Sequence, residues 1–334
     1  IVSPTIPNGY YASLEGLSGV ALKQAVQDII ANPSVVRAHN YGDIVDILKE
    51  ADRNPLNGSQ VWMMYVESPR SKIDYQTGNS NVGVWNREHI WPQSRGGFAD
   101  GTSSFADGID VWLPSGPDDI LAGHADAHHI RAEDGSENTT RSNRDYGSDY
   151  NGPTGNAGSW KGDVARALFY MAVRYNGLNL VDGNPVDSTV GQMGDLASLL
   201  TWNQTDPRDD FEMHRNNYIY TWQYNRKPFI DYPLLADYIF GSHFGDTWSF
   251  TLQQNNFNSE ALIVYPNPAN NEIYFSGVQQ PYTLQLYDVT GKKVMDQKIM
   301  TNQRIDVSGL SSGVYSVTLF SEVKTKTFKI IVQH

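Results

Sequence analysis

Apolar residues in the first 250 positions recur mostly at helical spacing. In the segment 164–175 they fall at i, i+4, i+7 and i+11, and Gly177 follows as a stop signal. The same reasoning predicts helices over 20–30, 44–48, 164–175, 191–203, 208–225 and 231–240. Strand-like runs are few, at 61–66 and 85–91. The stretch 92–158 is punctuated by Gly and Asp, and we expect it to be mostly loop.

The pattern changes after residue 250. Residues 251–261 are polar and predict a linker, after which short segments alternate apolar and polar positions between Gly-containing turns. This spacing is typical of a small β-sandwich. The predicted strands are 272–276, 283–287, 293–298, 303–307, 314–320 and 324–332. The expected fold class is α+β, with a mainly helical domain over 1–250, the linker, and an all-β sandwich over 262–334.

Composition narrows the function classes. The 334 residues include no cysteine, which excludes a disulfide scaffold, a thiol nucleophile, an iron–sulfur protein and a Cys-based zinc site. No stretch approaches the roughly 18 consecutive apolar residues of a membrane span. The net charge of −12 argues against nonspecific coating of nucleic acid. This charge lies entirely in residues 1–250, and many cations of that part fall in the motifs described next.

Two clusters of ionisable residues could carry chemistry. Residues 86–94 read NREHIWPQS, and residues 124–131 read HADAHHIR. Taken singly, the first could be a surface charge pair and the second a polar loop. Neither an HxHxDH nor an HExxH zinc pattern is present. A histidine without a serine or cysteine nucleophile suggests general-base activation of water. A carboxylate beside a neutral nitrogen ligand suggests a hydrated divalent cation, and nearby arginines suggest phosphate binding. Together these features indicate phosphodiester hydrolysis.

Residues 87–94 resemble the signature of the endonuclease I family of secreted bacterial nucleases, which belongs to the His-Me finger (ββα-metal) group. Three further blocks resemble the family in the same order, at 126–143, 162–175 and 206–231. The resemblance covers about residues 8–245. It implies a mainly helical domain built around a ββα-metal core.

The family pattern implies the roles of individual residues. His89 matches the general base, and Glu88 matches the carboxylate ligand of a single divalent cation. His129 stands where many relatives have an asparagine ligand, with His128 as the fallback. Mg²⁺ is the expected ion, although imidazole suits Mn²⁺ or Zn²⁺ better. The candidate phosphate-binding residues are Arg95, Arg131 and Arg141.

Three points are left open by the sequence. Adjacent residues on a flat strand point to opposite faces, so Glu88 and His89 can share a site only where the strand ends or bulges. Arg166 and Arg174 share one helix face, and they either line a DNA groove or pair with buried acids. Asn138 and Asn143 are expected to hold a loop through backbone hydrogen bonds.

The loop 96–130 carries no Lys or Arg. It therefore suggests a structural Ca²⁺ site, although no EF-hand spacing is present. The alternative is a solvated acidic loop. The candidate ligands are Asp100, Asp107, Asp110, Asp118, Asp119 and Asp126.

The C-terminal segment resembles the type A sorting domain of the Por (type IX) secretion system. The matching strings are YPNPA at 265–269, LYDVTGK at 286–292 and LSSGVYS at 310–316. This resemblance implies an origin in the Bacteroidetes, export through the periplasm to the cell surface or medium, and removal of the domain at 251–261. Composition alone would also fit a carbohydrate-binding module.

The sequence therefore predicts a secreted, divalent-metal-dependent endonuclease with low sequence specificity. The expected substrate is DNA, with RNA as a second candidate, and the expected partner is the type IX secretion machinery. No stable protein partner is predicted. The alternatives are another secreted metal-dependent phosphodiesterase and a catalytically inactive nuclease-like protein that binds nucleic acid or matrix.

Overall fold

The computed structural model describes residues 2–250, 263–276, 282–300, 303–320 and 325–334. The chain forms two compact units, Ile1–Ser249 and Phe250–His334. The predicted linker 251–261 lies outside the described residues. Among the described residues, no helix combines the length and apolar character needed to cross a membrane.

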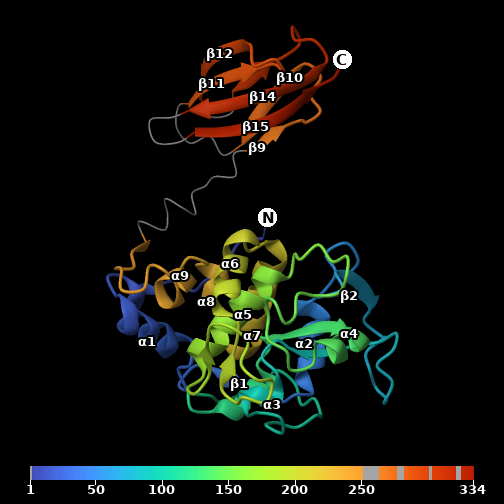
Figure 1. The fold of residues 1–334 in the computed structure, drawn as a ribbon, viewed down its shortest axis with the longest axis vertical. Coiled ribbons are helices and arrows are strands. Elements are labelled where there is room, and N and C mark those ends of the chain that lie inside the picture. Colours follow the sequence, from blue (N-terminus) through green and yellow to red (C-terminus); the bar gives the residue numbers. More distant parts are fainter. Residues whose placement is uncertain (1, 251–262, 277–281, 301–302, 321–324) are drawn as a thin grey trace. The chain divides into compact units, whose positions relative to one another are not determined.

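Unit 1 mixes helices with short two-stranded sheets, of which β7–β8 is parallel and the others are antiparallel (Figure 1). Its α-helices are α1 (Gly19–Ile30), α2 (Asp43–Ala51), α3 (Gln93–Gly96), α4 (Gly135–Arg141), α5 (Lys161–Arg174), α6 (Leu196–Thr205), α7 (Asp210–Gln223), α8 (Pro228–Asp231) and α9 (Leu235–Phe240). Its strands are β1 (Arg37–Ala38), β2 (Gln60–Met63), β3 (Ser68–Ser71), β4 (Trp85–His89), β5 (Leu113–Pro114), β6 (Ile130–Asp134), β7 (Asn179–Leu180) and β8 (Gln192–Met193). Two 3₁₀ helices, η1 (Ala12–Leu14) and η2 (Ile120–Ala125), complete the unit.

Helix α5 lies in the interior of unit 1 and packs against α1, α6 and α8 (Figure 1). Every residue from Gly162 to Arg174 is buried, including the charged ones. Arg166 pairs with Glu212 at 2.5 Å, and Arg174 donates to the carbonyl oxygen of Gly116 at 2.8 Å. Arg166 thus pairs with a buried acid, one of the two roles left open, whereas Arg174 binds backbone oxygens and the Ser115 hydroxyl instead of an acid. Both side chains are buried, so neither lines a DNA groove.

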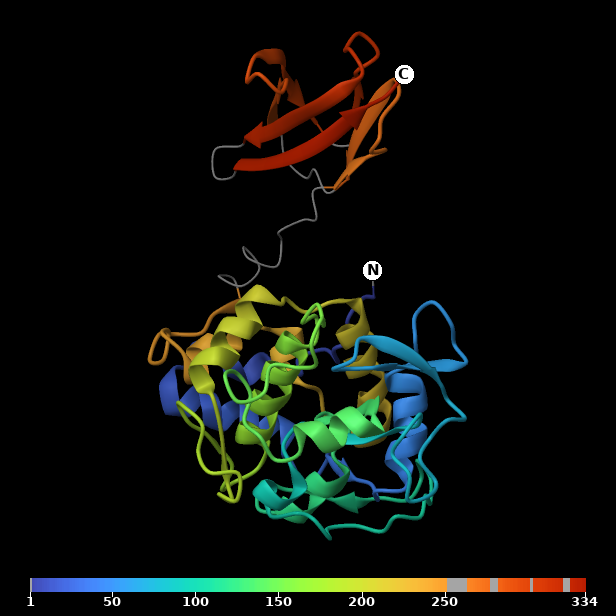
Figure 2. The ribbon, with the colours of Figure 1, turned by 45° about the vertical axis from the view of Figure 1, so that its right-hand side comes forward.

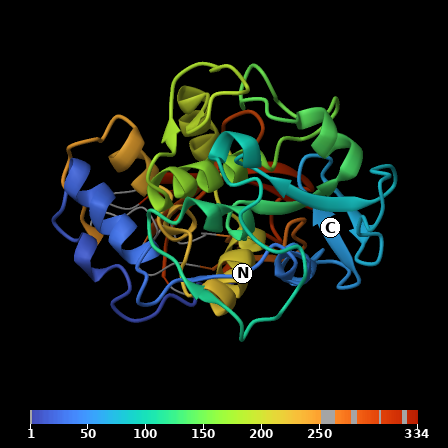
Figure 3. The same ribbon diagram turned by 90° about the horizontal axis from the view of Figure 1, so that it is seen from below.

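The region expected to be mostly loop contains the strand and helix that build the site. β4 and β6 pair antiparallel, with Glu88 opposite Arg131 and His89 opposite Ile130. Helix α4 follows β6 directly and contacts both strands (Figure 3). The Asp134 carboxylate caps α4 by accepting hydrogen bonds from two backbone N–H groups. The apolar periodicity missed β6 because its charged residues Arg131 and Glu133 are buried, so no polar face marks the strand.

Unit 2 consists of two antiparallel sheets (Figures 1 and 2). One has the order β13–β10–β9 and the other β12–β11–β14–β15. Alternate residues of both sheets, such as Ile273, Leu284 and Val317, share one buried core. Six strands agree with the prediction, and they are β10 (Glu272–Ser276), β11 (Tyr282–Tyr287), β12 (Lys293–Ile299), β13 (Arg304–Asp306), β14 (Gly313–Phe320) and β15 (Thr325–Val332). A further strand, β9 (Ile263–Tyr265), was not predicted.

Because each unit has its own core, a chain ending at Ser249 is expected to fold alone. Its thermal unfolding midpoint should match that of unit 1 in the full chain. All eight tryptophans lie in residues 1–249, so tryptophan fluorescence follows unit 1 in both proteins. A large drop in the midpoint, or loss of cooperative unfolding, would contradict independent folding.

Candidate catalytic pocket

A pocket of about 430 Å³ lies where β4 ends, between this strand, α3 and α4. It brings together residues from three separate stretches of the sequence, at 41, 87–99 and 138–143. Three of the predicted site residues, Glu88, His89 and Arg141, line it. The other lining residues are Tyr41, Arg87, Pro92, Gln93, Ser94, Ala99, Asn138, Thr139, Ser142 and Asn143.

Glu88 and His89 can share one site because the strand ends at this point. β4 ends at His89, and Pro92 begins the turn into α3. The chain therefore leaves the pleated strand at this point, and both side chains line the same pocket.

The His89 imidazole is held in one tautomer. Its Nε2 lies 3.0 Å from the carbonyl oxygen of His124, which can only accept, so Nε2 carries the proton. Nδ1 is then the basic nitrogen, and the side-chain amide of Gln93 lies 3.2 Å from it. Burial, with nearby His129 as a further cause, holds the pKa of His89 well below its usual value. The imidazole is therefore neutral at neutral pH and can accept a proton.

The Glu88 carboxylate is buried and held through one of its oxygens. Oε1 accepts a hydrogen bond from the Tyr65 hydroxyl at 2.7 Å and lies 3.2 Å from the Arg141 guanidinium. Burial raises the pKa of Glu88 to about 7, and the charge of Arg141 opposes this rise. Oε2 has no hydrogen bond to any described residue, so it can serve a ligand in the pocket.

Asn138 lies one turn into α4 and lines the same pocket. Its amide nitrogen lies 2.8 Å from Oδ1 of Asn86 and 3.3 Å from the backbone oxygen of Arg87. These bonds fix the amide and leave its oxygen without a hydrogen bond from the described residues. Asn138 thus holds strand β4, where a loop had been expected, and it also offers an oxygen ligand beside Glu88. The sequence could have indicated that Asn138 faces the pocket, because it lies three positions before Arg141 and therefore on the same helix face.

His129 does not line the pocket. Its ring is buried, with Nδ1 3.4 Å from the backbone N–H of Trp91 and Nε2 2.7 Å from the carbonyl oxygen of Gly123. Burial lowers the pKa of His129 to about 4. Both nitrogens are engaged, and the ring centroid lies 5.3 Å from that of His89. The structure thus places His129 as a packing neighbour of His89, away from the position expected for a cation ligand. His128 is also fully buried, with Nε2 at 3.1 Å from the carbonyl oxygen of Asn225.

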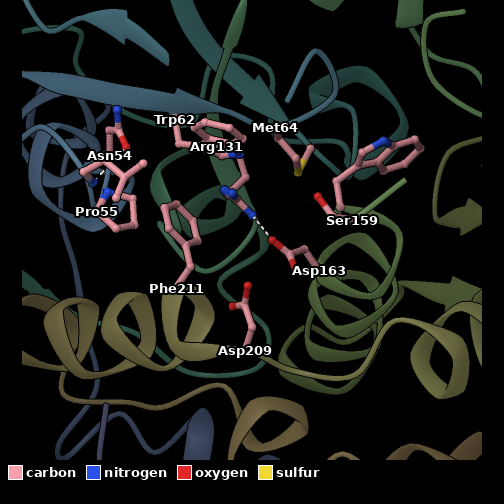
Figure 4. Close-up of a pocket in the computed structure, with 11 residues that line it drawn as sticks. Asn54, Pro55, Trp62, Met64, Arg131, Ser159, Asp163, Asp209 and Phe211 are labelled. Atoms are coloured by element: carbon pink, nitrogen blue, oxygen red, sulfur yellow. Dashed lines mark hydrogen bonds and ion pairs between the residues drawn. The ribbon is translucent and has the colours of Figure 1, made fainter. Parts of the chain in front are cut away.

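The three candidate phosphate-binding arginines lie in different surroundings. Arg141 lines the pocket, although its guanidinium donates to the carbonyl oxygens of His89 and Ile90. Arg95 is fully buried, and its guanidinium binds Asp145 at 3.0 Å. Arg131 lies in a separate pocket, where it pairs with Asp163 at 2.6 Å (Figure 4).

Arg87 also lines the catalytic pocket and received no role from the sequence. Its guanidinium stacks on the ring of Tyr41 at 3.3 Å and is only half-buried. It is therefore a cation that a phosphate in the pocket can reach. Its place in the 87–94 motif was the signal that could have identified it.

The acidic loop does not gather its carboxylates into one group within the described residues. Asp126, for example, accepts hydrogen bonds from Tyr170, Tyr175 and Gln223. The three carboxylates that do lie close together are outside this loop, with ligand atoms within 4.8 Å of one another: Asp145, Asp149 and Asp187. The acidic cluster therefore lies outside the loop 96–130, where the sequence had suggested it.

Comparisons with known proteins agree on both parts of the chain. The family model for endonuclease I matches residues 18–159 and 156–234. Extracellular ribonucleases from Bacillus amyloliquefaciens and from Bacillus subtilis (strain 168) are each 39% identical over 251 residues, which span 69% of this chain and 77% of the relative.

The model for a secretion system C-terminal sorting domain matches residues 263–333. A solved structure of PorZ, a surface component of the type IX secretion system of Porphyromonas gingivalis, matches 28% of this chain and 13% of that chain at 21% identity. Its TM-score of 0.20 supports no structural conclusion. The sorting domain identifies the chain as a secreted or cell-surface protein.

Proposed function

This chain belongs to the endonuclease I family, and we propose that it is a divalent-cation-dependent endonuclease in which His89 activates water. That it is a secreted nuclease follows from the family and the sorting domain. The proposal for its mechanism rests on one observation. A neutral, tautomer-fixed histidine lies beside a buried carboxylate and an unbonded amide oxygen in one pocket.

His89 acts as the general base. Nδ1 takes a proton from water, and the resulting hydroxide attacks the phosphorus of the scissile phosphodiester. The bond from phosphorus to the leaving 3′ oxygen breaks, and that oxygen takes a proton from solvent. The carbonyl oxygen of His124 keeps its hydrogen bond with Nε2–H throughout, and so stabilises the imidazolium as it forms. The amide of Gln93, close to Nδ1, limits rotation of the ring.

Glu88 and Asn138 are the proposed cation ligands. Both offer oxygen atoms, which suit a hard ion such as Mg²⁺ that keeps several of its waters. This pair replaces the predicted pair of Glu88 and His129, whose imidazole was the reason to consider Mn²⁺ or Zn²⁺. When bound, the cation supplies Lewis-acid stabilisation of charge on the phosphate and the leaving oxygen.

Arg87 and Arg141 are the proposed phosphate-binding residues. Arg87 is half-buried and held against Tyr41, so its guanidinium is oriented before the substrate arrives. Arg141 contributes through its positive charge, because its N–H groups already bind backbone oxygens. Arg95 and Arg131 are not proposed to bind the scissile phosphate, since their guanidinium groups pair with buried acids outside the catalytic pocket.

We propose RNA as well as DNA as substrate, because the two relatives are described as ribonucleases. The proposed ligands contact phosphate and water only, so the catalytic pocket itself does not discriminate between bases. The partner proposed for unit 2 is the type IX secretion machinery.

Removing the cation with EDTA is expected to abolish cleavage, and Asn138→Ala is expected to raise the Mg²⁺ concentration needed for half-maximal rate by roughly tenfold or more. Nuclease assays across a Mg²⁺ titration measure both effects. The matched control is Asn184→Ala, an exposed asparagine outside the pocket that bonds only Ser148 among the described residues. An unchanged Mg²⁺ requirement in Asn138→Ala would remove Asn138 from the ligand set. EDTA-resistant cleavage would overturn cation dependence itself.

A further inference from the structure

The second pocket of unit 1 has no role in the mechanism above. It encloses about 280 Å³ between β2, β6 and the starts of α5 and α7 (Figure 4). Its lining combines aromatic rings with one buried cation and two carboxylates. The lining residues are Asn54, Pro55, Leu56, Trp62, Met64, Arg131, Ser159, Trp160, Asp163, Asp209 and Phe211.

The aromatic part of this pocket provides ring faces for a planar ligand. Trp62 and Phe211 are half-buried and come from β2 and α7, and Figure 4 shows both beside Arg131. The Arg131 guanidinium lies 5.2 Å from the centre of the Phe211 ring. Aromatic rings and guanidinium planes are the surfaces on which unstacked nucleobases bind.

The charged side chains of this pocket include two hydrogen-bond acceptors, the carboxylates of Asp163 and Asp209, and one donor group, the guanidinium of Arg131. Asp163 receives Nη1–H of Arg131 at 2.6 Å. Asp209 uses Oδ1 to cap α7 at the backbone N–H of Glu212, and its Oδ2 has no hydrogen bond from the described residues. One guanidinium and two carboxylates give the lining a formal charge of −1. This charge repels a phosphate and favours a neutral ring rich in N–H groups.

We propose that this pocket is a guanine-binding subsite of the nuclease, a proposal that rests on the function proposed above. Guanine presents two adjacent donors, N1–H and the N2 amino group, which one carboxylate can accept together. Its O6 and N7 are acceptors that suit a guanidinium such as Arg131. Uracil offers one N–H donor, and adenine and cytosine offer a single amino group. None of these bases can donate two adjacent hydrogen bonds to one carboxylate as guanine does.

Two residues, Tyr65 and Arg131, link the subsite to the catalytic pocket. The Tyr65 hydroxyl binds Glu88 at 2.7 Å, and the Tyr65 ring packs 5.0 Å from Trp160, which lines the second pocket. In addition, Arg131 is the cross-strand partner of Glu88. A nucleotide near the scissile phosphate of a single strand is therefore the proposed occupant.

Binding of the free nucleoside tests the subsite without catalysis. Calorimetric titration of the full chain in EDTA is expected to show guanosine binding more tightly than uridine. Phe211→Ala should weaken guanosine binding roughly tenfold through loss of stacking. Asp209→Asn should also weaken it, and asparagine keeps the helix cap intact. The matched control is Asp195→Asn, the N-cap aspartate of α6, which lies outside the pocket and should bind guanosine normally.

Cleavage provides the second measurement. Single-stranded oligonucleotides with one guanine in a uridine or thymidine tract should be cut preferentially near that guanine, and Asp209→Asn should lose the preference. Equal binding of guanosine and uridine, or tighter binding of tetramethylammonium than of guanosine, would overturn the proposal. Failure of cation-dependent cleavage with normal guanosine binding would instead contradict only the proposed function.

Discussion

A chain carrying His89→Ala is expected to cleave nucleic acid about 10²- to 10⁴-fold more slowly than the wild type, which is the usual contribution of a general base. Alanine removes the Nδ1 acceptor and leaves the proposed cation ligands Glu88 and Asn138 in place. Substrate binding should therefore change little, and the loss should appear in kcat. Initial rates on plasmid DNA and on single-stranded RNA, at saturating Mg²⁺, measure it.

The control for this prediction is His214→Ala. His214 is a half-buried histidine of α7 whose Nε2 lies 3.0 Å from the backbone oxygen of Glu50, and it does not line the catalytic pocket. Its replacement should leave kcat near the wild-type value. Comparable rates for His89→Ala and the wild type, with both proteins folded by tryptophan fluorescence, would exclude His89 as the base.

Asp52→Ala is expected to reduce the free energy of unfolding of unit 1 by about 3–5 kcal/mol, the range for breaking a buried ion pair on one side. Asp52 is completely buried at the end of α2. Its carboxylate pairs with the guanidinium of Arg215 at 2.5 Å and of Arg131 at 3.1 Å. It also accepts the backbone N–H of Ala132 in β6 at 2.7 Å. Alanine would leave two buried cations without this partner.

Urea unfolding followed by tryptophan fluorescence measures this effect, since all eight tryptophans belong to unit 1. The matched control is Asp46→Ala on the same helix. Asp46 pairs with Lys49 at 3.1 Å, but its side chain is 59% exposed, so the expected loss is below about 1 kcal/mol. Equal losses for the two variants would show that the buried cluster does not stabilise unit 1 as proposed.

The family motifs give the surface of this acidic chain fewer cations than the sequence suggests. Most arginines of the family motifs are inside unit 1, and only a few can face a polyanion. The buried ones are Arg95, Arg131, Arg141, Arg166, Arg174, Arg215 and Arg226. The number of cations in the motifs therefore overstated how many can serve substrate binding. The half-buried Arg87, in the catalytic pocket, is the cation most directly placed for it.

The sequence by itself determined the features that depend on local pattern. Apolar periodicity located α1, α5 and α7, with ends within a few residues of the observed ones, because the buried face of a helix repeats every turn. Alternation likewise located the strands of unit 2, whose two sheets bury alternate residues. The motif at 87–94 and the three blocks that follow it identified the family, because four matching segments occur in the same order along the chain.

The tertiary structure alone decided which side chains meet. β6 and α4 lie in a stretch without clear periodicity, since pairing with β4 buries charged residues there. The sequence offered His129 as the second ligand beside Glu88 and gave Asn138 only a role in holding a loop. Only the fold shows that backbone groups engage both nitrogens of His129, while the oxygen of Asn138 is left unbonded in the pocket. Whether a polar atom can bind a ligand depends on neighbours distant in the sequence, and those neighbours are set by packing.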